Sequence, residues 1–333
     1  MQMSEFIGAL PKAELHLHLE GAIPWGIARA RNPELPARPP WWDDSFAFAD
    51  FAVDFTQAIR SCYYPALRAV EDYGRVAAEI FAGLAAQNAR YAEISFSPRY
   101  AYGIGLSIAD AARAVKRAAP AGLTVAVYAG FSREAGFRGD DPAVQATLAA
   151  PDLDGLDLHG DERKSEAAPF AELFAAARAR GLRLKAHAGE LRGPALVAEA
   201  LDSLGVARIE HGFSAAGDPA LVERLVAEQV TLDLCPTSNV KLGLLPALAA
   251  HPIRALYERG VRVTVSSDDP TVFGCTLTGE LHALVEHLGF SPAELARLQI
   301  NAFRAAKLPP DVCETIVAEI EDLVAQATVD VRR

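Results

Sequence analysis

Short apolar runs alternate with longer amphipathic stretches along most of the chain. Each apolar run ends in a polar residue or a glycine, and each amphipathic stretch carries Ala, Leu, Glu and Arg at helical spacing. Counting a first strand within residues 11–21, this pattern predicts eight strands. The other seven are Arg90–Ser97, Leu123–Ala129, Leu153–Leu158, Leu182–His187, Ala207–His211, Val230–Leu234 and Val261–Ser266. Strands that alternate with helices indicate parallel βαβ units, and eight units favour an α/β fold of the closed (β/α)8 TIM type.

The intervening helices follow from the same pattern. They are Asp72–Asn88, Ser107–Ala119, Ala167–Ala179, Pro194–Ser203, Pro219–Ala227 and Ala247–Arg259. Further helices are expected at the C-terminus, over residues 277–328, after the last strand. We see no internal boundary and expect one domain over residues 1–333.

An insertion follows the first strand, over residues 22–70. Four prolines within residues 32–40 exclude a regular helix there. Asp44-Ser45 is expected to cap a helix that carries Phe46, Phe48, Phe51 and Phe55. Its apolar face either closes over a pocket as a lid or packs into the core, and both readings stay open.

Composition excludes several classes of function. Of the 333 residues, 51% are hydrophobic, which is ample for a core, and the net charge is −11 without a Lys/Arg run. Nucleic-acid and anionic-membrane partners are therefore not expected. The four cysteines are far apart and include no Cys-x-x-Cys, so neither a thiolate zinc site nor a disulfide framework is indicated. We find no signal peptide and no apolar run long enough to cross a bilayer, and we expect a cytoplasmic protein.

Reactive side chains gather where the predicted strands end. The motifs are His16-Leu-His18, His159-Gly160-Asp161-Glu162, His187-Ala-Gly-Glu190, Glu210-His211-Gly212, Cys235-Pro-Thr-Ser-Asn239 and Ser267-Asp268-Asp269-Pro270. Surface polarity without function would scatter such residues over loops and helices. Barrels of this type carry their chemistry at the C-terminal ends of the strands, so the pattern predicts a catalytic rim.

A metal site is the first chemistry that these residues indicate. His16 and His18 are two residues apart on a strand, so both imidazoles leave the same face. A lone His-x-His pair is more often two hydrogen-bonded histidines, but His187 and Asp268 complete a ligand set for Zn²⁺ or a similar ion. The adjacent Asp268 and Asp269 would repel each other when buried unless a cation or a proton offset them. A bound metal makes water a nucleophile near neutral pH.

Two further residues are candidates for moving protons. His211 either takes a proton from the water or is a core histidine. Glu190 either stays protonated in a dry pocket and protonates the substrate, or lies at the start of the next helix. Lys185 either bridges two metals as a carbamate or forms a structural ion pair, and we favour one metal and an ion pair.

Together these motifs resemble the adenosine/adenine deaminase family of the amidohydrolase superfamily, in order and from the first strand to the last. The resemblance implies hydrolytic removal of the 6-amino group of a small-molecule purine, giving a 6-oxopurine and ammonia. It implies one zinc ion per chain, with His16, His18, His187 and Asp268 as its ligands.

The resemblance also implies roles around the purine. Glu190 would protonate N1, His211 would act on the water, and Asp269 would hydrogen-bond to N7. The backbone N–H of Gly160 would meet N3. Glu20 stands where animal adenosine deaminases have an aspartate that meets a ribose hydroxyl.

Three residues differ from the family pattern and bear on the choice of substrate. Glu20 replaces the shorter aspartate, as in adenine and 6-aminodeoxyfutalosine deaminases. Ser267 and Glu210 also depart from the family pattern, and we expect all three near the sugar. Because Phe273-Gly-Cys-Thr-Leu277 is closer to nucleoside-type members, we predict deamination of adenosine to inosine. Adenine and 6-aminodeoxyfutalosine deaminases are the alternatives within the family.

Two further hypotheses assign the protein a function other than aminopurine deamination. One is an amidohydrolase that cleaves a ring amide or ester, which would need no acid at an aromatic nitrogen. The other is a purine-binding protein without catalysis. We predict no particular oligomeric state.

Overall fold

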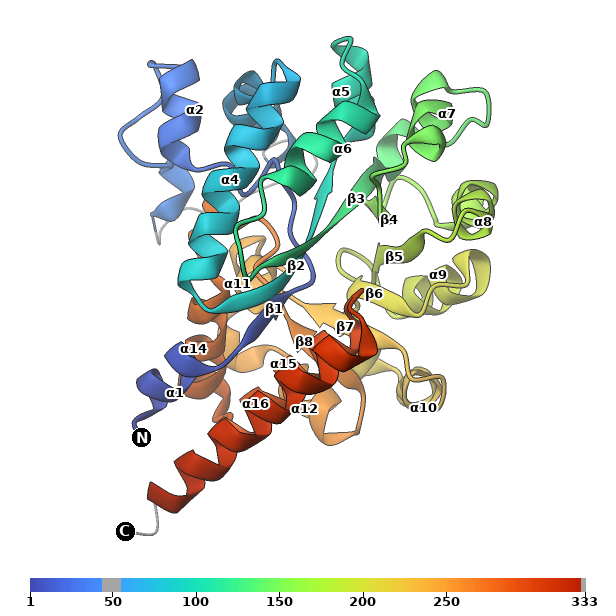
Figure 1. The fold of residues 1–333 in the computed structure, drawn as a ribbon. Helices are drawn as coiled ribbons and strands as arrows, with labels where there is room; N and C mark the ends of the chain where they lie inside the picture. The colour runs from blue at the N-terminus through green and yellow to red at the C-terminus, as the bar shows by residue number, and fades with distance from the viewer. Residues whose placement is uncertain (44–54, 331–333) are drawn as a thin grey trace.

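Eight parallel strands form the centre of the computed structural model, which describes residues 1–43 and 55–330 (Figure 1). Each strand pairs with the next one in sequence, from first to last. The strands are β1 (Lys12–Glu14), β2 (Ala89–Phe96), β3 (Thr124–Ser132), β4 (Gly155–His159), β5 (Arg183–Ala188), β6 (Arg208–His211), β7 (Thr231–Leu234) and β8 (Arg262–Val265). The predicted (β/α)8 barrel is confirmed.

Helices surround these strands, as Figure 1 shows. Those of the barrel and its N-terminal part are α1 (Met3–Ala9), α2 (Trp25–Arg31), α3 (Thr56–Ala58), α4 (Val70–Ala86), α5 (Pro98–Gly103), α6 (Ile108–Arg117), α7 (Pro142–Ala149), α8 (Ala171–Ala179), α9 (Ala195–Leu204) and α10 (Pro219–Ala227). The later ones are α11 (Pro236–Lys241), α12 (Ile253–Glu258), α13 (Pro270–Phe273), α14 (Leu277–Leu288), α15 (Pro292–Ala305) and α16 (Pro310–Asp330). The last three are the extra helices expected after the final strand. No helix within the described ranges is both long and apolar enough to cross a membrane.

The predicted helix over residues 247–259 is interrupted. A 3-10 turn covers Leu248–Ala250, and α12 begins only at Ile253. Pro252 explains the break, because the residue before a proline is pushed out of the helical region. In the insertion, α2 ends at Arg31 and the next described element is a 3-10 turn at Pro40–Trp42, as the prolines require.

The predicted helix with four phenylalanines lies mostly outside the described residues. Phe46, Phe48 and Phe51 belong to that part. Phe55 is described, and its ring stacks on Phe273 with 5.9 Å between the ring centroids.

The barrel closes between β1 and β8 through an irregular seam. The backbone N–H of Asp268 donates to the carbonyl of His16 (2.9 Å), and the N–H of His18 donates to the carbonyl of Asp268 (3.1 Å). Deeper in the seam, the Leu15 N–H donates to Ser266 Oγ at 3.2 Å. Side chains thus replace part of the ladder, and β1 is only three residues long. Three of the four predicted metal ligands, His16, His18 and Asp268, thus lie on the backbone that closes the barrel.

Charged side chains fill the barrel beneath its C-terminal rim. Arg208 contacts Glu93 (2.7 Å) and Asp233 (2.5 Å), and Lys185 Nζ lies 2.8 Å from Glu210. All five are buried. Each charge has a partner, which offsets the cost of its burial. Lys185 therefore forms the structural ion pair that we favoured.

Glu280 gives the fold a testable dependence on pH. Burial raises the pKa of this carboxyl on α14 from 4.5 to about 7. The folded state therefore holds a proton that the unfolded chain releases, and stability falls as the pH rises from about 4.5 to about 7. Glu280→Gln should raise the free energy of unfolding at pH 8 by up to about 3 kcal/mol and leave it unchanged at pH 4. Denaturant titrations at both pH values measure this.

Glu286→Gln is the matched control, because Glu286 lies on the same helix but is exposed. It should change stability by less than about 0.5 kcal/mol at either pH. Equal effects of Glu280→Gln at pH 4 and pH 8 would contradict the assignment.

Candidate active site

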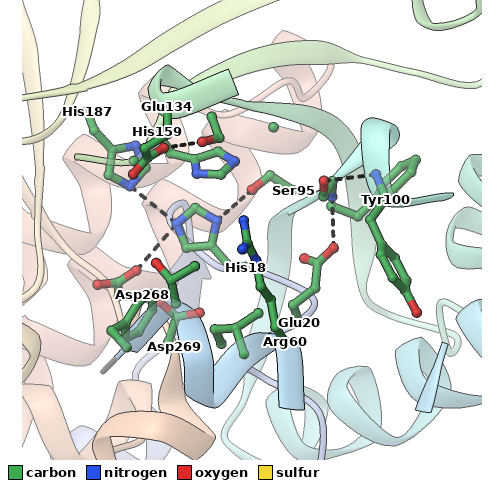
Figure 2. Close-up of a pocket in the computed structure, with 18 of the residues that line it drawn as sticks. His18, Glu20, Arg60, Ser95, Tyr100, Glu134, His159, His187, Asp268 and Asp269 are labelled. Atoms are coloured by element: carbon green, nitrogen blue, oxygen red, sulfur yellow. Dashed lines mark hydrogen bonds and ion pairs between the residues drawn. The ribbon is translucent and has the colours of Figure 1, made fainter. Parts of the chain in front are cut away.

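A cavity of about 700 Å³ opens at the C-terminal ends of the strands (Figure 2). Most of the predicted site residues line it together, although they come from distant parts of the sequence. These are His18, Glu20, Gly160, His187, Glu190, His211, Asp268 and Asp269. His16 is fully buried and contacts the imidazoles of His18 and His187. The topology of the barrel thus gathers them at one rim, as expected.

Three imidazole nitrogens converge beside a carboxylate. The Nε2 atoms of His16, His18 and His187 lie 3.1–3.3 Å from one another. Asp268 Oδ1 lies 3.3 Å from the first and 3.4 Å from the second. Ligands 2.0–2.1 Å from a metal in tetrahedral directions are about 3.3 Å apart. The predicted ligand set therefore fits one metal ion.

The opposite nitrogen of each ring has its own partner. Ser95 Oγ lies 2.9 Å from His18 Nδ1, and Cys235 Sγ lies 3.4 Å from His16 Nδ1. His187 Nδ1 lies 3.0 Å from Glu210 and 3.2 Å from Asp157. Partners of this kind fix the orientation of a metal-binding histidine and leave its other nitrogen free for the metal.

Asp268 is held by its backbone and by a neighbour. Its φ is +61°, an unusual conformation for a residue other than glycine, and the Ser238 hydroxyl donates to its Oδ2 at 2.7 Å. His211 has a similar φ of +59°. Strained backbone of this kind is often found at functional sites.

Glu190 lies inside the cavity rather than at the start of α9, which begins at Ala195. Burial is the main cause that raises the pKa of Glu190 well above the ordinary value, which favours the protonated carboxyl. Its Oε1 lies 3.4 Å from His211 Nε2. Its loop is anchored by Glu162, whose carboxylate accepts the N–H of Glu190 (3.3 Å) and of Leu191 (3.0 Å). Glu162 belongs to the motif after β4, but the sequence pattern indicates no role for it.

Asp269 is packed against the loop after β1. A Cβ on Gly21 would lie 1.6 Å from its Oδ1, so only glycine allows this approach. Burial and the adjacent Asp268 raise the pKa of Asp269 well above its ordinary value. Within the pair, a proton is therefore favoured on Asp269 rather than on Asp268, whose pKa is lowered by His16 and its other histidine neighbours.

Of the three departures that we expected near the sugar, only Glu20 lines the cavity. Its Oε1 accepts the backbone N–H of Ser97 at 2.8 Å, and burial raises its pKa to about 7. The expectation was wrong for Ser267, whose hydroxyl donates to Glu14 at 2.6 Å, and for Glu210, which lies behind His187. Both side chains are buried beneath the rim by contacts that the sequence pattern does not reveal.

Gly160 has a φ of +93°, and a Cβ there would lie 2.3 Å from the carboxylate of Glu134. Glu134 in turn accepts the N–H of Asp161 at 2.7 Å. These contacts fix the loop after β4 at the wall of the cavity.

The fold and the site define a metal-dependent barrel hydrolase of the amidohydrolase superfamily. The family model described as adenosine deaminase matches residues 11–323, and the chain belongs to that family. An adenine deaminase from Rhodospirillum rubrum is 38% identical over 92% of this chain and 94% of its own length. One from Streptomyces coelicolor is 38% identical over 91% of this chain and 92% of its own.

Solved structures agree. An adenine deaminase from Arthrobacter aurescens superimposes with a TM-score of 0.86 at 30% identity, covering 95% of this chain and 99% of that one. An amidohydrolase from Burkholderia ambifaria with bound Zn gives 0.83 at 25% identity, covering 99% and 96%. The chain is therefore a hydrolase that acts on the C–N bond of an aminopurine.

Removing one histidine tests the metal site. We expect the purified protein to bind one divalent ion per chain, and His16→Ala to weaken binding on the order of 100-fold or more. The variant should keep its circular dichroism spectrum, because the apolar core of the fold does not include the proposed metal ligands. Metal analysis after dialysis provides the measurement.

His282→Ala is the control, since His282 is exposed on α14 and should bind metal like the wild type. Full metal content in His16→Ala would contradict the ligand set.

Proposed function

We propose that the protein is a zinc-dependent adenine deaminase, which converts adenine and water into hypoxanthine and ammonia. The cluster of three imidazoles and Asp268, facing Glu190 and Asp269 across one cavity, carries this proposal. The choice of adenine rests on the relatives named adenine deaminase.

Zinc is the ion that this donor set favours. Three imidazoles, which bind a metal in their neutral form, and one carboxylate suit Zn²⁺. When bound, such an ion would lower the pKa of a water molecule and make it nucleophilic near neutral pH.

Glu190 supplies the proton for the purine ring. Attack of water at C6 places negative charge on N1, and a protonated carboxyl beside N1 removes that charge by donating its proton. The C6 carbon then carries both oxygen and nitrogen. When the C6–N6 bond breaks, the amino group leaves as ammonia with one proton from the water, and the oxygen stays on C6. The other proton of the water returns to Glu190, which restores the acid.

Asp269 and Gly160 hold the ring. Because the pKa of Asp269 is raised, its neutral carboxyl donates a hydrogen bond to the lone pair of N7, and the substrate needs no proton there. The backbone N–H of Gly160, fixed by the loop after β4, donates to N3. Together these contacts orient C6 toward the metal ligands.

Nucleoside deamination is the second candidate, as the sequence pattern predicted. The cavity of about 700 Å³ has the volume of sites for drug-sized ligands and exceeds what a bare base requires. Glu20 and Arg60 also line it, and Figure 2 shows Glu20 on the side of Tyr100, away from His187. Adenosine or 6-aminodeoxyfutalosine would place its N9 substituent there. The insertion also supplies Phe55 and Tyr64 to the lining of the cavity, which supports its role as a cover.

A substrate panel distinguishes these candidates. We expect kcat/KM for adenine to exceed that for adenosine, 2′-deoxyadenosine and 6-aminodeoxyfutalosine at least about tenfold, which is about 1.4 kcal/mol. Ammonia release under the same conditions is the readout. If kcat/KM were higher for one of the nucleosides than for adenine, that nucleoside would be the substrate and the proposal of adenine would be wrong.

Glu190→Gln tests the acid. Without a proton to donate to N1, kcat should fall on the order of 100- to 10,000-fold, with KM little changed and metal content unchanged. Glu166→Gln, at an exposed position, should keep wild-type kinetics. Retained turnover in Glu190→Gln would instead favour the chemistry of amide or ester cleavage.

A further inference from the structure

Two buried side chains lie behind His211 and have no role in the chemistry described so far. Asn239 is on α11 and His251 precedes α12, and both are inaccessible to solvent or nearly so. Asn239 belongs to a motif at the end of β7, whereas His251 belongs to none that the sequence revealed. His211 Nε2 faces the cavity, where it lies 3.4 Å from Glu190, and its Nδ1 lies 3.2 Å from Asn239 Nδ2.

A backbone amide fixes the direction of hydrogen bonding in this group. The N–H of Ile253 lies 3.1 Å from His251 Nδ1. A backbone N–H only donates, so Nδ1 of His251 is an acceptor and the proton of the neutral ring is on Nε2. Burial lowers the pKa of His251 to about 3, which keeps the ring neutral.

The next bond fixes the amide of Asn239. His251 Nε2–H lies 3.1 Å from Asn239 Oδ1, the one atom of the amide that accepts. The NH2 group therefore points the other way, toward His211 Nδ1, and donates to it. The orientation of an amide and the tautomer of an imidazole are usually ambiguous. Here the backbone N–H of Ile253 determines the tautomer of His251, and this tautomer determines the orientation of the Asn239 amide.

The consequence falls on the nitrogen that faces the cavity. When His211 is neutral, its Nδ1 accepts from Asn239 and its proton is on Nε2. If the ring were charged, Nε2 would carry a proton as well. In neither state does Nε2 offer a lone pair.

We propose that Asn239 and His251 are positioning residues that hold His211 with the proton on Nε2, so that His211 donates a hydrogen bond to the attacking water instead of accepting its proton. The inference rests on the proposed hydrolytic deamination for its effect on rate, but not for the tautomer itself. It revises the role that the family resemblance implies for His211. The proton that leaves the water then passes to the carboxylate of Glu190, which has given its own proton to N1.

The tautomer is directly measurable. Zinc-loaded protein labelled with 15N-histidine should show His211 with an unprotonated Nδ1 and a protonated Nε2 in long-range 1H–15N spectra, assigned by the signals lost in His211→Gln. The opposite pattern would overturn the proposal. This spectrum requires no substrate, so it stands even if no aminopurine is turned over.

Asn239→Asp reverses the hydrogen bond without changing shape. A carboxylate only accepts, so it still receives the proton of His251 Nε2 but now draws the proton of His211 to Nδ1. We expect the reversed tautomer, kcat lowered on the order of 10- to 100-fold, unchanged KM and full zinc content. A reversed tautomer with kcat equal to or above that of the wild type would show that His211 acts as a base, and would overturn the proposal.

Two further variants complete the test. Asn301→Asp is the matched control, because Asn301 on α15 donates to the carbonyl of Val263 (3.0 Å), away from this chain of bonds. It should leave the His211 spectrum unchanged. His251→Phe removes the donor that orients the amide and should give a mixture of both tautomers. An unchanged single tautomer in His251→Phe would exclude His251 from the positioning role.

Discussion

The site depends on how each histidine uses its second ring nitrogen. An imidazole directs a lone pair at a cation only when its other nitrogen carries the proton and has an acceptor or partner. Here Ser95 Oγ contacts Nδ1 of His18, and the carboxylates of Asp157 and Glu210 contact Nδ1 of His187. Three converging lone pairs without a cation would be a costly arrangement in a buried place. The three Nε2 atoms lie 3.1–3.3 Å from one another. This spacing indicates a metal ion more strongly than the identity of the residues does.

The closure of the barrel and the metal cluster are one feature of the backbone. The seam between β1 and β8 is bonded through the main chain of His16, His18 and Asp268, and the left-handed φ of Asp268 turns its carboxylate back toward the two histidines. A ligand set on these strands is therefore positioned by the same bonds that close the sheet. The rigid scaffold determines the geometry, and the loops above it determine what enters.

The sequence predicted the barrel and the cluster because both depend on local signals. Alternation of apolar runs with helices sets the topology, and the topology brings strand ends together. It did not predict what lies beneath the rim. Glu210 departs from the family pattern, and only the fold shows that it faces Lys185 and His187 instead of the substrate. His251 is missed for the same reason, because its bond to Asn239 joins two loops with no shared motif.

The reaction and the choice of substrate belong to different parts of the cavity. The strand ends supply the groups that act on C6, N1 and N7, and those groups fit every 6-aminopurine equally. Glu20 also lines the cavity, where its Oε1 accepts the N–H of Ser97. A base alone carries no hydroxyl for this carboxyl, whereas a sugar hydroxyl would hydrogen-bond to it directly. Because a carboxyl with a pKa of about 7 can donate as well as accept near neutral pH, one residue is able to serve either ligand. Motifs of the rim therefore identify the reaction, while the substrate depends on side chains that the rim motifs do not include.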